Sequence, residues 1–162
     1  MAVSSDIVRT WRGPRRVVRD LLAQGRREDR ALVYLMAGLL IVFVARLPAL
    51  QRDAILSGTD FTRDASYAFF GLIIISPLLF YGLAEIGRLV AWVFGNAISS
   101  YSGRLALFWA WLAASPAALL YGLGAGFVGP EETATQIVGA IWLAAFFWFW
   151  IQGVREAAKA GA

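Results

Sequence analysis

An uncharged run from Leu105 to Pro130 constrains the fold of this chain more than any other feature. The run is longer than the roughly 20 apolar residues that a helix needs to cross a bilayer. Small residues recur four apart along it, and such spacing lets a neighbouring backbone approach one side of a membrane helix. We expect this segment to be the central helix of a membrane bundle, with Ala117 pointing away from the packing stripe. The stripe consists of Ala110, Ala114, Ala118, Gly122 and Gly126.

Composition places the whole chain among integral membrane proteins. Hydrophobic residues make up 59% of the 162 residues, and they fall in blocks longer than soluble cores use. The sequence contains no Cys and no His, which excludes disulfides, thiol redox chemistry, His-ligated metals and His-based catalysis. No nucleotide-binding or catalytic motif is present. We therefore expect a non-enzymatic protein without a cofactor and without a nucleic-acid partner.

The apolar blocks predict an all-α, polytopic helical bundle with four spans. The first span ends where Pro48 marks its exit, and a polar loop covers residues 49–64. Pro130, followed by two acidic residues, is a strong start signal for the last span. A fifth or re-entrant span within residues 86–103 is the alternative. The expected spans are 31–47, 65–84 prolonged to 94, 105–128 and 133–154.

Residues 1–30 form a cytoplasmic basic segment that contains an amphipathic helix. Gly13 and Pro14 interrupt the helical pattern. Pro14 is expected to begin the amphipathic helix and Gly25 to end it. Its apolar face carries Val17, Val18, Leu21 and Leu22, and its basic face carries Arg15, Arg16 and Arg19. We expect the helix to lie in the membrane interface with this basic face on anionic lipid head groups. The alternative is a helix docked on the cytoplasmic face of the bundle itself.

The distribution of Lys and Arg predicts the orientation of the bundle. With four spans, the N-terminal segment, the 95–103 loop and the tail at 156–162 share one side. Twelve of the 15 basic residues fall near that side, and only Arg46, Arg52 and Arg63 fall near the other. By the positive-inside rule, both termini face the cytoplasm. The bundle at 31–155 is thus expected in a bacterial inner membrane, and Arg46 is expected to snorkel outward from the far end of the first span.

Two Ser-Pro pairs are the first candidates for a polar site within the membrane. Pro77 frees the carbonyl of Ile73, and Pro116 frees that of Leu112, because proline lacks an amide hydrogen. The hydroxyls of Ser76 and Ser115 are expected to donate to these two carbonyls. The favoured interpretation is a matched pair of satisfied kinks, and the alternative is a hinge or a mid-membrane polar site. The surrounding segments resemble each other, and the alternatives are a relic of an inverted repeat and a coincidence in a membrane chain rich in Gly and Pro.

Glu85 and Arg88 are the only charged pair inside an apolar run, which makes them the second candidate site. Their spacing of three residues allows an ion pair on a helix. Arg104, which opens the third span on the same side, is a further partner for Glu85. A structural clamp at the cytoplasmic interface is the favoured interpretation, and a proton or ligand site is the alternative.

The loop from Phe94-Gly95 through Ser100-Tyr101-Ser102-Gly103-Arg104, leading into Trp109-Ala110-Trp111 and Ser115-Pro116, carries a family resemblance. It resembles the Gly-rich loop before a Pro-containing span in the Yip (Ypt/Rab-interacting) family of multispanning membrane proteins. The likeness covers roughly residues 25–155, and family members often have five spans. For a bacterial protein it implies an inner-membrane protein without a defined activity.

The leading hypothesis from the sequence is an adaptor, scaffold or membrane-organising protein that contacts the lipid bilayer and a protein partner or a second copy of itself. A small-solute transporter or channel component, and an accessory subunit of a larger membrane complex, are the alternatives. Polar side chains converging at mid-membrane would favour transport. A dry, closed bundle with a free lipid-facing surface would favour an adaptor or subunit.

Overall fold

The structure, a computed structural model, describes residues 3–161, and every regular element in that range is helical. Two short helices, α1 (Val3–Arg12) and α2 (Pro14–Ala23), come first. Four long helical segments follow, each long and apolar enough to cross a membrane. The prediction of an all-α bundle with four spans is confirmed. The long segments are α3 (Glu28–Ser57), the continuous α4–η1–α5 (Phe61–Phe69, Phe70–Ile75 and Ser76–Val93), α6 (Ser100–Phe127) and α7 (Thr133–Gly161).

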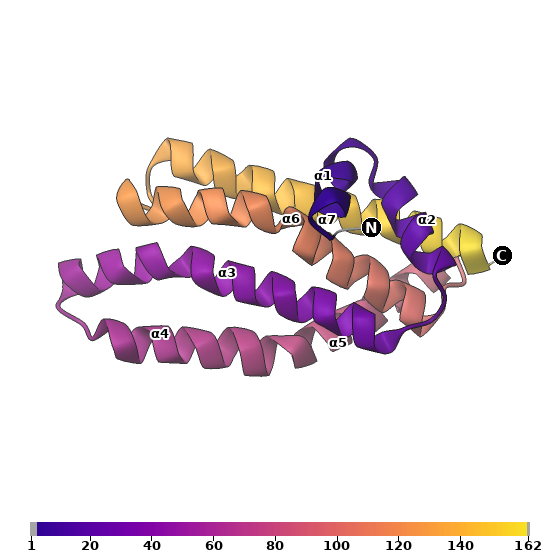
Figure 1. The fold of residues 1–162 in the computed structure, drawn as a ribbon, viewed down its shortest axis with the longest axis horizontal. Helices are drawn as coiled ribbons and strands as arrows, with labels where there is room; N and C mark the ends of the chain where they lie inside the picture. The colour runs from indigo at the N-terminus through magenta and orange to yellow at the C-terminus, as the bar shows by residue number, and fades with distance from the viewer. Residues whose placement is uncertain (1–2, 162) are drawn as a thin grey trace.

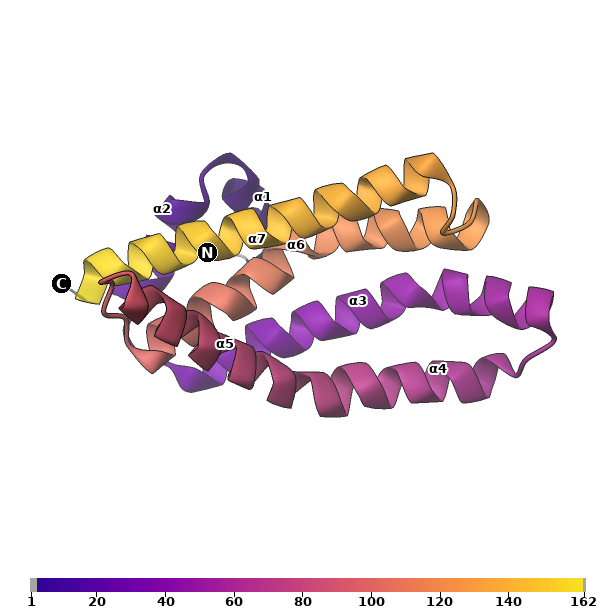
Figure 2. The same cartoon turned by 180° about the vertical axis from the view of Figure 1, so that it is seen from behind.

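The long helices form two antiparallel hairpins, α3 with α4–α5 and α6 with α7 (Figure 1). The α3–α4 and α6–α7 turns lie at one end of the molecule, which we call the turn end. The α5–α6 loop, α2 and the C-terminal part of α7 lie at the other, which we call the terminal end (Figure 2). The four spans therefore alternate in direction, as the sequence predicts.

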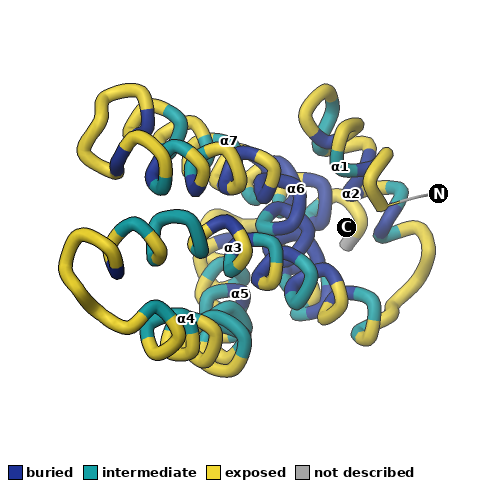
Figure 3. The backbone as a smooth tube through the Cα atoms, turned by 60° about the vertical axis from the view of Figure 1, so that its left-hand side comes forward, coloured by how far each residue is buried: buried dark blue, intermediate teal, exposed yellow. Residues whose placement is uncertain are grey.

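Helix α6 is the centre of the bundle. Between Leu105 and Ala118 every residue is buried except Trp111 and Pro116, and Figure 3 shows this buried stretch covered by the other helices. A helix that is apolar on all sides is expected in such a position. Ala117, which was expected to point away from the stripe, is also buried, with only 6% of this residue exposed. The central part of α6 has packing neighbours all round.

Helix α3 continues nine residues beyond Pro48, so the predicted loop over 49–64 was wrong. A proline inside a helix removes one hydrogen bond and adds a ring. Here the ring lies against Gly126 of α6, where a Cβ would come within 2.8 Å of the Pro48 carbonyl carbon. The helix ends at Gly58 in the left-handed conformation (φ 67°), and the Asp60 side chain caps α4 by accepting the Arg63 N–H at 3.1 Å. Only residues 58–60 connect the two helices.

The second span bends through a π-helical turn at Phe70–Ile75. The Ser76 backbone N–H donates to the carbonyl of Gly71, and the Ser76 hydroxyl donates to the same oxygen at 2.9 Å. The prediction that Ser76 donates to Ile73 was therefore wrong. In the wider turn just before Pro77 the acceptor of the hydroxyl lies two residues further back along the chain than predicted, and such a π-bulge accommodates a proline in a span.

Residues 86–103 form neither a fifth nor a re-entrant span. Helix α5 runs on to Val93, residues 94–99 form the loop, and α6 begins at Ser100. The hydroxyl of Ser99 caps α6 by accepting the Ser102 N–H at 3.1 Å. Helix α7 extends past the predicted end at 154 to Gly161, so the described part of the predicted tail is helical.

Candidate functional site

The last two small residues of the stripe on α6, Gly122 and Gly126, lie where α6 meets α3. A Cβ added at Gly122 would overlap the carbonyl oxygen of Ala45, and one at Gly126 would overlap the Pro48 ring. Further toward the terminal end, Gly38 of α3 lies against α6. A Cβ added at Gly38 would be 2.6 Å from the Trp111 side chain and 3.2 Å from the Leu112 Cα atom. At each of these glycines the backbone of one helix therefore touches the other helix directly. Small residues permit such close packing of helices in a membrane.

A charged cluster joins three helices near the terminal end. Arg88 Nε lies 2.6 Å from Glu85 Oε2, and an Arg104 nitrogen lies 3.4 Å from Glu85 Oε1. The other terminal nitrogen of Arg104 lies 2.6 Å from Glu28 at the start of α3, and the Ser100 hydroxyl donates to Glu85 at 3.5 Å. Both predicted pairs of Glu85 are present. Because the cluster ties the ends of α3, α5 and α6 together, its geometry is that of a clamp.

Neither Ser-Pro pair leaves a free hydroxyl. The buried Ser115 donates to the Leu112 carbonyl at 2.8 Å, as predicted, and Ser76 donates to Gly71. Each hydroxyl is used by the backbone of its own helix. The two serines therefore do not join the charged cluster, and the five polar residues singled out in the sequence do not form one site.

The N-terminal helices pack on the bundle with their apolar faces inward. Val17, Val18 and Leu21 of α2 are buried, with at most 3% exposed, and Val18 reaches toward Gly153 of α7. This is the docked arrangement that the sequence left as the alternative. The apolar face that was expected to enter the lipid is covered by protein.

Two of the three arginines expected to meet lipid contact α7 instead. Arg15 Nε donates to the Gln152 side chain at 2.6 Å, and Arg19 lies 3.8 Å from Glu156. Gln152 and Glu156 are buried on one face of α7, one turn apart. Arg16 is exposed on the opposite side of α2 and remains turned away from the bundle.

Helix α1 is held on α6 by two tryptophan hydrogen bonds. The buried Trp109 Nε1 donates to the Thr10 hydroxyl at 3.1 Å, and Trp11 Nε1 donates to the Ala113 carbonyl at 3.0 Å. Between α1 and α2, Arg9 pairs with Asp6 at 2.8 Å and Asp20 at 3.1 Å. The hydrogen bonds to these carboxylates raise the pKa of Arg9, which keeps the link charged.

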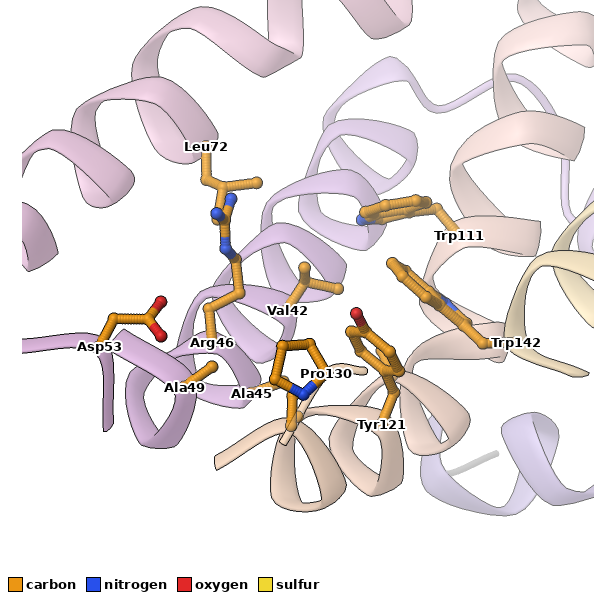
Figure 4. Close-up of a pocket in the computed structure, with 13 residues that line it drawn as sticks. Val42, Ala45, Arg46, Ala49, Asp53, Leu72, Trp111, Tyr121, Pro130 and Trp142 are labelled. Atoms are coloured by element: carbon orange, nitrogen blue, oxygen red, sulfur yellow. The ribbon is translucent and has the colours of Figure 1, made fainter. Parts of the chain in front are cut away.

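A groove of about 430 Å³ opens near the turn end, between α3 and η1 on one side and α6 and α7 on the other. We call it the outer groove. Figure 4 shows Arg46 and Asp53 of α3 and Leu72 of η1 facing Trp111 and the other aromatic side chains across it. Its floor is the seam between α3 and α6. The remaining lining residues include Val42, Ala45, Ala49, Tyr121, Gly122, Pro130 and Trp142.

The polar groups of the outer groove are without partners in the part of the chain that the structure describes. Arg46 and Asp53 line the groove seven residues apart, yet they form no ion pair with each other or with any other residue of 3–161. The indole nitrogens of Trp111 and Trp142 are shielded and have no acceptor. Within residues 3–161 no group of three or more acidic residues could hold a metal ion.

The sequence pointed to the charged cluster and, as an alternative, to a docked α2, but neither to the outer groove nor to α7 as the partner of α2. Glu28 was missed because the first turn of a helix attracts acidic residues anyway. Gln152 and Glu156 carried a usable signal, since two polar residues one turn apart interrupt an apolar helix face. Comparison of the chain with known proteins gives no match to a family model, to a characterised protein or to a solved structure.

Proposed function

We propose that this chain is a non-enzymatic adaptor or accessory subunit of a bacterial inner membrane, with its termini in the cytoplasm. The observation that carries the proposal is the unequal burial of its spans. In the most apolar part of α6, 72% of the residues are buried, against 6% in the α4–η1–α5 span. The chain thus has a packed core and one span with few fully buried residues, in which Leu72, Ile73 and Phe80 pack against the core while another face is free to meet lipid or other membrane helices.

The free face of α4–η1–α5 has space for a second helix. Gly71 and Gly82 lie on it, and a Cβ added at either would have no neighbour within 4 Å. Between them, Leu78 and Leu79 are exposed. Glycine beside large apolar side chains is the pattern that lets membrane helices approach closely.

The Ser-Pro pairs and Glu85 offer no free polar group for a solute path, and the unpaired charges of the outer groove, Arg46 and Asp53, lie toward the turn end, which favours an adaptor over a transporter. A solute path needs polar groups that are free to meet a solute at mid-membrane. Ser76 and Ser115 donate to their own helices, and Glu85 is held by Arg88 and Arg104.

A photo-crosslinking amino acid placed at Leu79 in living cells tests this proposal. We expect a discrete protein adduct, formed either with a partner or with a second copy of the chain. The same amino acid at Ile141, which is exposed on α7, is the control and should give a weaker adduct or none. Labelling of lipid alone at both positions would contradict the adaptor proposal.

A further inference from the structure

We propose that the outer groove binds one phospholipid with a primary ammonium head group, such as phosphatidylethanolamine, from the leaflet at the turn end. The groove presents three chemistries in order: an apolar, aromatic deep end, then a cation at Arg46, then an anion at Asp53 at its mouth. Such a lipid presents the complementary order, from acyl chain to phosphate to ammonium. The proposal is independent of the adaptor function.

Arg46 is the group that would bind the phosphate. It lies 16 residues after Arg30, about 24 Å along α3 at 1.5 Å per residue, whereas the hydrocarbon core is about 30 Å thick. The backbone of Arg46 is therefore only about 6 Å inside the far surface, and its exposed side chain can snorkel outward to the depth of the lipid phosphates. No carboxylate of residues 3–161 lies within ion-pair distance of it. A phosphate offers oxygens that match the planar donor fork of arginine.

Asp53 provides the second charge at the matching place. It is seven residues beyond Arg46, so it lies on the same face of α3, about 10 Å nearer the turn end. Its carboxylate is exposed and makes no ion pair in the described chain. The ammonium of the head group extends outward from the phosphate and would reach this carboxylate. A head group without a cation would instead bring its phosphate toward an unpaired anion.

The deep end of the groove suits an acyl chain and its ester group. Trp111 lies against Gly38, which is eight residues before Arg46, so this end is about 12 Å from the cation. Val42, Leu72 and Trp142 line the intervening wall. The unpaired indole N–H of Trp111 lies at this end and that of Trp142 on the wall, and an ester carbonyl could accept from either. The volume of about 430 Å³ falls within the roughly 300–1,000 Å³ of ligand sites.

Thermal melting of the delipidated, detergent-purified full chain tests the proposal. We expect phosphatidylethanolamine to raise Tm saturably, and phosphatidylglycerol with the same acyl chains to raise it less. Arg46→Gln should weaken the apparent affinity for phosphatidylethanolamine about tenfold, as loss of a charged hydrogen bond does. Asp53→Asn should abolish the preference between the two lipids.

Two further variants keep the test decisive. Arg63→Gln removes a cation at the same end that pairs with Asp64 outside the groove, so it should respond to lipid like the unmodified chain. Ala49→Trp fills the groove without changing its charge and should also abolish the shift, even if Arg46→Gln does not fold. The proposal is overturned if Arg46→Gln or Ala49→Trp keeps the full shift, or if phosphatidylglycerol equals phosphatidylethanolamine. It is also overturned if soluble glycerophosphoethanolamine, which lacks acyl chains, reproduces the effect.

Discussion

Gly122 illustrates at the scale of a single residue why α6 can be the centre of the bundle. Its missing side chain is the space that the Ala45 carbonyl occupies. Burial in lipid gives no hydrophobic drive between helices, so close contact of this kind supplies the association. The sequence predicted the stripe from spacing alone, but spacing could not reveal that Ala117 is buried too. A stripe identifies one packed face and carries no information on the others.

Gly122→Ala should destabilise the folded bundle by about 1–3 kcal/mol, the usual cost of overpacking. The added methyl group overlaps a backbone atom, which cannot rotate away. Gly82→Ala is the matched control, because Gly82 is also a helical glycine in a span but has open space at its Cβ. A thermal melt in detergent measures both. Equal melting temperatures for the two variants would mean that the α3–α6 contact is not close.

Arg104 should be the most sensitive charged residue. Its side chain is 15% exposed and pairs with Glu28 and Glu85, so Arg104→Gln removes the two ion pairs that join α6 to α3 and α5. We expect a loss of about 1–3 kcal/mol, moderated because both carboxylates are partly solvated. Arg63→Gln breaks an exposed pair with Asp64 and should cost less than about 1 kcal/mol. Denaturant unfolding of both variants in mixed micelles measures the difference in their free energies of unfolding. If Arg104→Gln is no more harmful than Arg63→Gln, the charged cluster is not a clamp.

At the scale of whole helices, sequence patterns located the elements better than their ends and partners. The apolar face of α2 was read correctly from its periodicity, but amphipathicity does not distinguish lipid from a neighbouring helix. The end of α3 was misplaced because Pro48 is a helix breaker in isolation. Its ring is accommodated by Gly126, which lies 78 positions away in the chain. Such tertiary compensation leaves no local trace in the sequence.

Docking of α1 and α2 can be tested with one polar substitution. Val18→Asn buries an amide without a partner, which costs about 1–3 kcal/mol on mutational scales. Helices α1 and α2 should then detach from the bundle more often, and amide hydrogen exchange within residues 3–23 should become faster. Val8→Asn, at a position that is 58% exposed, should leave exchange unchanged. Identical exchange in the two variants would show that α2 is not held by its apolar face.

For the molecule as a whole, the central feature is a bundle of four spans that alternate in direction. The turns at 58–60 and 128–132 lie at one end, and the N-terminal helices, the 94–99 loop and the end of α7 lie toward the other (Figure 1). The number of spans could be predicted from the lengths of the uncharged segments. This signal is strong because every backbone polar group in lipid must be hydrogen-bonded within the protein, so a long uncharged segment has to be a helix. Which face of the bundle carries a groove did not follow, since it depends on how far α7 and η1 diverge.

Labelling of single cysteines with a membrane-impermeant maleimide tests this arrangement most directly. The chain has no native cysteine, so each substitution is the only thiol. Thr59→Cys and Glu131→Cys should react in intact cells. Ser4→Cys, Ala97→Cys and Ala160→Cys should react only after the membrane is opened; all five positions are exposed. Reaction of Ala97→Cys together with Thr59→Cys in intact cells, or of Ala160→Cys without Ser4→Cys, would contradict a four-span bundle.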